Sequence, residues 1–391
     1  MLKRTIYDEE HLLFLKQCER FFEREVTPYH EQWEKDGVVP REVWRKAGAA
    51  GLLCPSVPEA YGGAGADFLF HACATEAQGR AGATGPGFSI HSDIISPYFV
   101  QHGTEEQKKR WLPGMVSGDV IAAVAMTEPG TGSDLQGIQT TAVRDGDDWV
   151  INGAKTFISN GQLADITVVV AKTAPGAGSR SFSLFLVESD RPGFVRGRNL
   201  EKVGMKAQDT SEMFFENVRV PHTNLLGEEG RGFHHLMQEL AQERLSIALL
   251  ATAGAEAALG WTIDYVAERR AFGKAIGEFQ ATRYNIAELA TKVQVTRTFI
   301  DQCTIAHTKG ELDIATAAAA KLWASEIQGE IVDAGLQLHG GYGYMWEYPI
   351  ARAWADARIQ RIYGGTSEIM KELISRKVLD PVVQAKQGPK R

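Results

Sequence analysis

The sequence predicts a mainly α-helical protein with one inserted β-domain. Apolar residues recur at helical spacing in residues 1–120, short β-rich runs fill residues 121–229, and long helical patterns return in residues 230–391. Because the strands form one block and do not alternate with helices, a doubly wound parallel sheet is not expected. We expect an N-terminal helical domain, a middle antiparallel β-domain and a C-terminal helical domain within these limits.

In the first zone, apolar spacing predicts helices and proline predicts their ends. Leu12, Leu15, Cys18 and Phe21 mark one face of an amphipathic helix. Breaks are expected at Pro28, Pro40, Pro55, Pro58 and the glycine-rich run 61–65.

The secondary structure of the middle and last zones is predicted from their own residue patterns. In the middle zone, the runs 149–151, 166–170 and 182–187 are separated by turn clusters at 145–148 and 175–178, which is typical of a compact sheet. The last zone returns to long helices, with an Ala-rich stretch at 315–320 and a boundary at Phe272-Gly273.

Length and charge limit the possible functions. The 391 residues suffice for two or three domains with sizeable cores. The net charge of -7 argues against nucleic acid as a main partner, because phosphate contacts need a basic face. No G-x-G-x-x-G follows a predicted strand and opens a helix, so a Rossmann site is not expected.

The spacing of the cysteines and the composition of the N-terminal segment both indicate a reducing compartment. Cys18, Cys54, Cys73 and Cys303 lie far apart without C-x-x-C spacing, as expected for reduced thiols. The start has no apolar signal region, and no stretch approaches the ~18 apolar residues of a membrane span, so stable membrane insertion is not expected. Bacterial cytoplasm is the preferred location, and a processed mitochondrial matrix protein would look similar.

Glycine is in excess, with 40 residues against 14 prolines, and one cluster lies in Met126–Asp134. Gly130 and Gly132 allow a sharp turn and close backbone approach, and Thr127 and Ser133 supply hydroxyls. Such a loop suits the polar edge of a planar heterocycle. An ordinary tight turn explains the cluster equally well.

Residues 233–251 show a long apolar stripe that includes Glu243 and Arg244. A carboxyl group on an apolar face is poorly solvated, which raises its pKa towards the range of a general base. The alternative is a carboxylate at the edge of the stripe, paired with a basic residue of another helix.

Two further glycine-rich segments lie near the C-terminus. His339-Gly-Gly resembles an esterase oxyanion loop, but no G-x-S-x-G elbow is present, so a structural role is expected for His339. At 362–368, Thr366 is a good helix N-cap behind two glycines; a capped surface helix explains Thr366 but not the glycine pair. His235 and Glu239 share a helix face without a third ligand, so no metal site is expected.

Taken together, these segments resemble the acyl-CoA dehydrogenase family of flavoproteins over residues 6–381. The resemblance is carried by residues 126–134, 157–160, 269–274, 279–280, 337–343 and 363–366. It implies a helical domain, a β-domain and a C-terminal four-helix domain, and a homotetramer.

The resemblance also implies FAD as the cofactor. Matching positions place the flavin-ring contacts at Val124, Met126, Thr127, Gly132, Ser133, Phe157, Ile158 and Ser159. They place contacts to the FAD of a neighbouring subunit at Arg269, Phe272, Gln280, Gln337, Gly340 and Gly341, with further contacts at Thr366 and Glu368. Many relatives have Trp and Thr where this chain has Phe157 and Ser159; the aromatic face and the hydroxyl are retained.

One departure decides the predicted base. Many family members carry the catalytic glutamate directly after the tyrosine that matches Tyr363, but this chain has Gly364 there. The long-chain and isovaleryl-type branches carry the base at the position of Glu243, and the surrounding segments look most like the long-chain enzymes. By the same resemblance, Ser133, Arg244, Tyr363, Gly364 and Gly365 form the substrate site.

The implied reaction is α,β-dehydrogenation of a medium- to long-chain fatty acyl-CoA to the trans-2-enoyl-CoA. Glu243 would remove the α-proton while a hydride passes from Cβ to flavin N5, and an electron-transfer flavoprotein would accept the electrons. Alternatives are an isovaleryl-like branched-chain dehydrogenase, an acyl-CoA oxidase, and a flavin-containing acyl-CoA-binding protein that has lost catalysis.

Overall fold

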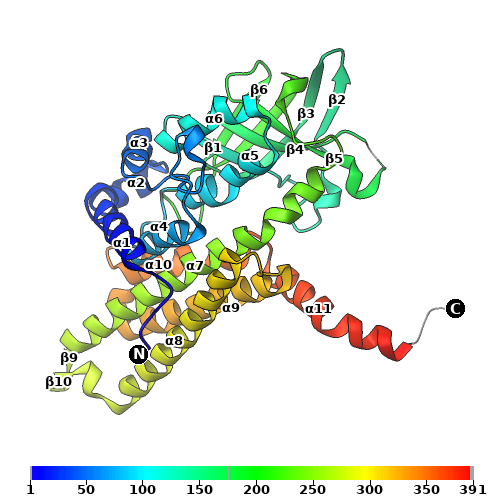
Figure 1. The fold of residues 1–391 in the computed structure, drawn as a ribbon. Helices are drawn as coiled ribbons and strands as arrows, with labels where there is room; N and C mark the ends of the chain where they lie inside the picture. Colours follow the sequence, from blue (N-terminus) through cyan, green and yellow to red (C-terminus); the bar gives the residue numbers. More distant parts are fainter. Residues whose placement is uncertain (1, 175, 388–391) are drawn as a thin grey trace. The chain divides into compact units, whose positions relative to one another are not determined.

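The computed structural model describes residues 2–174 and 176–387, so Pro175 of the predicted turn 175–178 lies outside the described residues. The chain divides into two compact units (Figure 1). As far as they are described, unit 1 comprises Met1–Phe22, Ala72–Ala83 and Ala241–Arg391, and unit 2 comprises Glu23–His71 and Thr84–Leu240. The predicted limits at residues 120 and 229 stay predictions.

Unit 2 is built around an eight-stranded sheet in the order β6-β7-β3-β2-β4-β5-β8, with β1 paired to β4. The strands are β1 (Ala122–Ala125), β2 (Thr141–Asp145), β3 (Asp148–Ser159), β4 (Ile166–Lys172), β5 (Phe182–Glu188), β6 (Phe194–Asn199), β7 (Thr210–Pro221) and β8 (Leu225–Leu226). Most neighbours are antiparallel, as predicted, but β1 runs parallel to β4, and β2 meets β4 in a parallel bridge. Sequence periodicity cannot reveal this pairing, because it carries no information on strand direction.

The two faces of the sheet contribute to two different cores. Val168 and Val170 of β4 belong to a cluster that includes Phe99 and Leu112 of the helices against the sheet, whereas Val169 faces a cluster on the other side. Because β4 and β5 are covered on both faces, they are apolar at nearly every position. Among the described residues, the α-helices wholly within unit 2 are α2 (His30–Asp36), α3 (Arg41–Ala49), α5 (Ser96–His102) and α6 (Glu105–Ser117).

Unit 1 is helical. Its long helices α8 (Gln280–Thr308) and α9 (Ile314–His339) lie side by side (Figure 1), and α11 (Ser367–Gln387) packs on α9. The remaining elements with residues in unit 1 are α1 (Glu9–Phe21), α4 (Phe68–Arg80), α7 (Gly232–Glu268), α10 (Pro349–Ala357), β9 (Arg270–Ala271) and β10 (Lys274–Ala275). The structure is 58% helical, which confirms the predicted fold class.

Buried charges also hold unit 1 together. The Glu76 carboxylate is fully buried and accepts hydrogen bonds from Arg4 at 2.7 and 2.8 Å and from Arg297 at 2.8 Å. Arg297 also donates to Glu256 of α7. These bonds connect the N-terminal segment, α4, α7 and α8.

One described helix, α7, contains an 18-residue window that is apolar enough to cross a membrane by length and composition. Of this window, 67% is buried inside the protein. Core helices of soluble proteins pass the same test, so the window is weak support for a membrane span. The sequence prediction that no stretch approaches a span overlooked this window.

Candidate functional site

Glu243 and Arg244 lie on α7 and are buried, with exposed fractions of 5% and 4%. This agrees with the prediction that both fall on the apolar stripe, where Ile247 and Ala251 are also buried. Burial lowers the pKa of the Arg244 guanidinium, and the charge of Glu243 opposes this change. A carboxyl group and a guanidinium group therefore lie in neighbouring positions in a poorly solvated part of unit 1.

Arg244 has unused hydrogen-bonding capacity. Its Nε and Nη1 atoms are buried and find no hydrogen-bond partner among the described residues. Leaving donors of a charged group unpaired inside a protein is costly, and such donors often serve a ligand.

A turn of two glycines packs against α7 one helical turn after Glu243. Gly364 and Gly365 have φ angles of 61° and 98°, in the region that favours glycine. A Cβ atom at Gly364 would overlap Cδ1 of Ile247, which lies one helical turn after Glu243. The Gly364 turn therefore packs against α7 one helical turn after the predicted base, within unit 1.

The residues that flank the turn are held by local hydrogen bonds. Thr366 accepts from the amides of Ile369 and Met370, so it caps α11 as predicted. The Tyr363 hydroxyl donates to Gln360 at 2.8 Å. Glu368 is exposed in the first turn of α11, and hydrogen bonds to its carboxyl from a backbone amide and from Thr366 lower its pKa.

The predicted flavin-ring contacts lie in two neighbouring segments of unit 2. After β1, Glu128 and Thr131 exchange backbone hydrogen bonds across the Met126–Asp134 loop. The Thr156 amide of β3 donates to the Thr127 carbonyl at 2.9 Å, which ties the loop to the strand that carries Phe157. Phe157 is 65% exposed and has a φ angle of 60°.

A buried ion pair braces these two segments. Lys155 of β3 donates to the Glu128 carboxylate at 2.9 Å and to the Met126 carbonyl at 3.0 Å. Glu128 also accepts from the Gln139 and Thr140 amides. Burial lowers the pKa of Lys155 to about 8, although Glu128 opposes this change. Sequence reasoning missed the pair, because its members are 27 residues apart.

The other predicted FAD contacts lie on the surface of unit 1. Phe272 is 96% exposed at the tip of the β9–β10 hairpin, and Arg269 lies over the Tyr342 ring. The side chain of Gln280 bonds to Tyr284, and Gln337 is exposed. Among the described residues other than the flanking ones, no heavy atom lies within 4 Å of the position that a Cβ would take at Gly130, Gly132, Gly340 or Gly341. A ligand could therefore approach the backbone at each of these glycines.

His339, for which a structural role was expected, packs inside unit 1. It is buried, its Nδ1 lies 2.7 Å from the Gly335 carbonyl oxygen, and its ring stacks on Tyr265.

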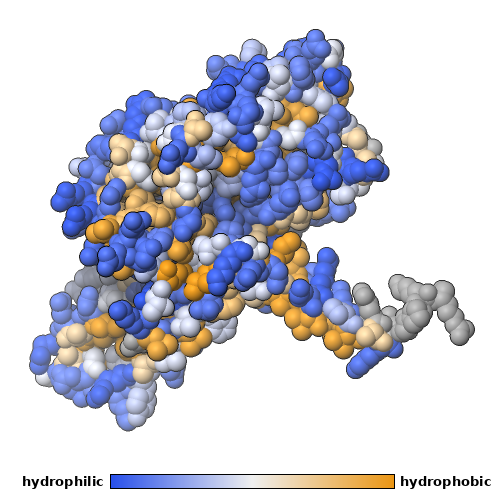
Figure 2. All heavy atoms as spheres, in the orientation of Figure 1, coloured by the Kyte–Doolittle hydropathy of each residue, from blue (hydrophilic) through white to orange (hydrophobic). Residues whose placement is uncertain are grey.

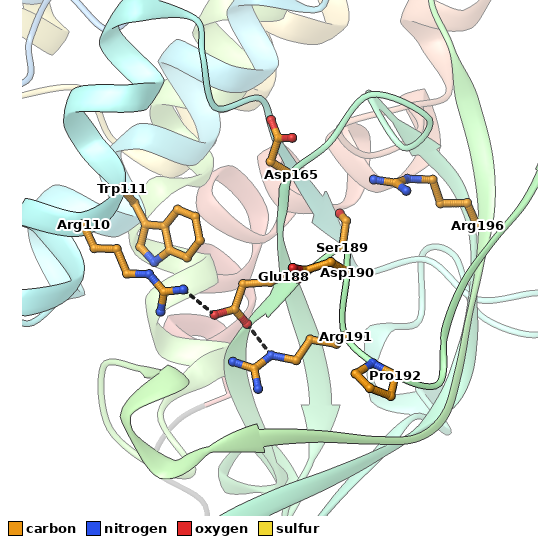
Figure 3. Close-up of a pocket in the computed structure, with 9 residues that line it drawn as sticks. All are labelled: Arg110, Trp111, Asp165, Glu188, Ser189, Asp190, Arg191, Pro192 and Arg196. Atoms are coloured by element: carbon orange, nitrogen blue, oxygen red, sulfur yellow. Dashed lines mark hydrogen bonds and ion pairs between the residues drawn. The ribbon is translucent and has the colours of Figure 1, made fainter.

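A surface cavity of about 730 Å³ in unit 2 contains none of the predicted site residues (Figure 3). Its wall carries Glu188, which accepts charge-assisted contacts from Arg110 at 2.9 Å and Arg191 at 2.7 Å. Arg196 donates to the Ala164 carbonyl. Because these charges already pair with protein groups, we assign no ligand to this cavity.

One other polar constellation bears on alternative chemistries. Ser56, His71 and Asp93 form a hydrogen-bonded row, with His71 at 2.8 Å from Ser56 and 2.7 Å from Asp93. Because His71 and Asp93 are buried and the row connects three segments of unit 2, we interpret it as a packing network. In residues 2–174 and 176–387, no group of three His, Cys, Asp or Glu residues could hold a metal ion.

Three family models match this chain in the predicted order. They describe the N-terminal, middle and C-terminal domains of acyl-CoA dehydrogenase and match residues 8–119, 123–218 and 230–379. The chain belongs to the acyl-CoA dehydrogenase family. It is an oxidoreductase, and the resemblance found in the sequence is confirmed.

Among curated relatives, the long-chain specific acyl-CoA dehydrogenase of Rattus norvegicus is 53% identical over 96% of this chain and 88% of its own length. An isovaleryl-CoA dehydrogenase of Oryza sativa is 35% identical over 95% of this chain and 92% of its own length. An acyl-CoA dehydrogenase crystal structure from Geobacillus kaustophilus has a TM-score of 0.94 at 48% identity and covers 95% of this chain and 99% of its own. A Mycobacterium smegmatis glutaryl-CoA dehydrogenase in complex with FADH2 has a TM-score of 0.90 at 28% identity, over 96% of both chains.

Proposed function

We propose that this acyl-CoA dehydrogenase oxidises medium- to long-chain fatty acyl-CoA to trans-2-enoyl-CoA with FAD, and that Glu243 is the base. The observation that carries the proposal is the position of Glu243, buried on α7 one turn before Ile247, whose Cδ1 fills the space at Gly364. Glycine at 364 can supply a backbone amide but no base. The carboxylate must therefore come from another element, and α7 supplies one.

Different protein groups have different proposed roles towards the substrate. Glu243 takes the α-proton, and the thioester oxygen gains electron density as this proton leaves. The Gly364 amide is the protein donor proposed for that oxygen, because a preorganised donor stabilises charge that develops in the transition state. Arg244, Tyr363 and Gly365 of unit 1 shape the thioester and CoA site, and the unpaired donors of Arg244 suit a polar ligand.

The residues present fit FAD. The open backbone at Gly130 and Gly132 and the exposed Phe157 ring suit a planar ring system, and the Lys155–Glu128 pair holds their segments together. When bound, FAD accepts the hydride that leaves Cβ. The residues proposed to hold the flavin ring are Val124, Met126, Thr127, Gly132, Ser133, Phe157, Ile158 and Ser159.

We further propose a homotetramer in which Arg269, Phe272, Gln280, Gln337, Gly340 and Gly341 contact the FAD of a neighbouring subunit, with Thr366 and Glu368 as further FAD contacts. The almost fully exposed Phe272 supports this assignment, because aromatic rings are enriched in interfaces. The end of α11 also exposes apolar side chains, visible along the helix in Figure 2. They are Val378, Leu379, Val382 and Val383. An electron-transfer flavoprotein is the proposed electron acceptor.

A panel of acyl-CoAs added to the yellow protein without oxygen tests the proposal. Loss of the oxidised-flavin absorbance with palmitoyl-CoA and octanoyl-CoA supports dehydrogenation of straight chains. Faster loss with isovaleryl-CoA would favour the branched-chain alternative. If no acyl-CoA bleaches the flavin, the proposal fails and the alternative of a non-catalytic acyl-CoA-binding protein gains support.

A further inference from the structure

Lys321 is a buried cation that the proposed reaction does not use. It lies on α9, its side chain is fully buried, and its Nζ donates to the Gly365 carbonyl oxygen at 2.7 Å. Burial and the charge of Arg244 lower the pKa of Lys321 to about 8, although Glu326 and Glu368 oppose this change. Burying an ammonium group costs free energy, so its retention next to the Gly364 turn calls for a physical reason.

The partner of Lys321 is a turn that needs an external restraint. Gly364 and Gly365 both have positive φ angles, and two successive glycines have more accessible conformations than any other residue pair. On either side the chain is held by backbone bonds, from the Tyr363 amide to Ile359 and from the Met370 amide to Thr366. Within the glycine pair, the bond from Lys321 fixes the direction of the Gly365 carbonyl.

We propose that Lys321 is a positioning residue for dehydrogenation: by binding the Gly365 carbonyl oxygen, its ammonium group holds the glycine turn so that the Gly364 amide is presented to the acyl thioester oxygen. This inference rests on the proposed function. It assigns Lys321 no contact with substrate or FAD.

The physical argument is one of preorganisation. A donor that stabilises developing enolate charge must already point at the thioester oxygen, since reorientation during the reaction consumes free energy. Without the Lys321 bond, the Gly364–Gly365 turn samples other conformations and the amide is correctly oriented for a smaller fraction of the time. Substrate affinity comes mainly from contacts elsewhere along acyl-CoA, so loss of Lys321 lowers the reaction rate more than binding.

The test uses the holoenzyme with two substitutions. Lys321→Met keeps the length of the side chain but removes the hydrogen-bond donor, and Lys321→Gln retains a donor on a shorter side chain. Lys292→Met is the control, because Lys292 is a partly exposed lysine of α8 that bonds Glu330. Flavin content and circular dichroism establish that each variant is folded. The measurements are the anaerobic flavin-bleaching rate at saturating acyl-CoA, the acyl-CoA dissociation constant, and the amount of enolate formed from acetoacetyl-CoA, which has an acidic α-proton and no hydride on Cβ.

For Lys321→Met we expect bleaching slowed by about tenfold or more, with the dissociation constant changed by less than about threefold. Enolate formation falls as well, and Lys321→Gln recovers part of both losses. A wild-type bleaching rate and enolate yield in Lys321→Met would overturn the proposal. So would a loss that Lys321→Gln does not relieve at all, or that Lys292→Met reproduces. The proposed function is tested separately by Glu243→Gln. Failure of the Lys321 proposal can therefore be distinguished from failure of the proposed function.

Discussion

The Gly364 backbone lies so close to Ile247 that a Cβ atom at residue 364 would overlap Cδ1 of Ile247. Ile247 follows Glu243 by one turn of α7, so the space available at residue 364 is coupled to the helix that carries the proposed base. A side chain at residue 364 would therefore require Ile247 to change its side-chain conformation.

We predict that Gly364→Ala lowers the free energy of unfolding by about 2–4 kcal/mol, because alanine is strained at a φ of 61° and displaces Ile247. Truncation of the neighbour in Ile247→Ala/Gly364→Ala should recover part of this loss. Urea denaturation of the two single variants and the double variant measures the coupling. Strictly additive effects of the two substitutions would show that the contact is unimportant.

For Arg244 we predict a loss of function without a matching loss of stability. Since two of its guanidinium nitrogens are buried without a partner among the described residues, Arg244→Met removes a costly group and should lower the unfolding free energy by less than about 1 kcal/mol. Acyl-CoA affinity should fall by about tenfold or more. Isothermal titration with acyl-CoA and urea denaturation check the two parts. If the affinity for acyl-CoA were unchanged, Arg244 would not be part of the substrate site.

The Lys155–Glu128 pair should control FAD affinity. Lys155→Met removes the bonds to Glu128 and to the Met126 carbonyl, which releases the loop that follows β1. Because the buried Glu128 carboxylate then lacks its cationic partner, we expect the FAD dissociation constant of the apoprotein to rise by about tenfold or more. Lys172→Met on strand β4 of the same sheet is the control and should leave the FAD dissociation constant unchanged. Equal affinities of Lys155→Met and wild type would contradict this account.

Glu76 should make unit 1 sensitive to acid. Burial acts to raise the pKa of Glu76, but the charges and hydrogen bonds of Arg297, Arg4 and Arg80 outweigh it and lower the pKa to about 2. A carboxyl group whose pKa falls on folding stabilises the protein fully above its unfolded pKa of 4.5, and this stabilisation is lost as the pH falls towards 2. Glu76→Gln should cost roughly 3 kcal/mol at pH 7. In urea titrations between pH 5 and pH 3, its stability should fall less steeply than that of the wild type; parallel slopes would exclude Glu76 as the cause.

The sequence predicts those parts of the site whose signal is local. The apolar stripe at 233–251 draws attention to Glu243, and the family resemblance predicts its role as the base. The Gly-Gly-Thr pattern indicates the turn and the N-terminal end of α11. Contacts between residues distant in the chain could not be predicted. Lys321 is a single lysine after an Ala-rich run, and only folding shows that it is buried against Gly365. The Arg4–Glu76–Arg297 network includes a bond between residues 221 positions apart, for which periodicity gives no sign.

The most direct test of the central claim is anaerobic mixing of Glu243→Gln with a saturating straight-chain acyl-CoA while the flavin absorbance is followed. The substitution keeps the shape of the side chain and removes the base. Glu239→Gln, one turn earlier on α7 and equally buried, is the matched control. We predict that Glu243→Gln retains yellow FAD and binds acyl-CoA but bleaches at least about a thousandfold more slowly than wild type, whereas Glu239→Gln bleaches normally. Bleaching of Glu243→Gln at the wild-type rate would show that the base lies elsewhere.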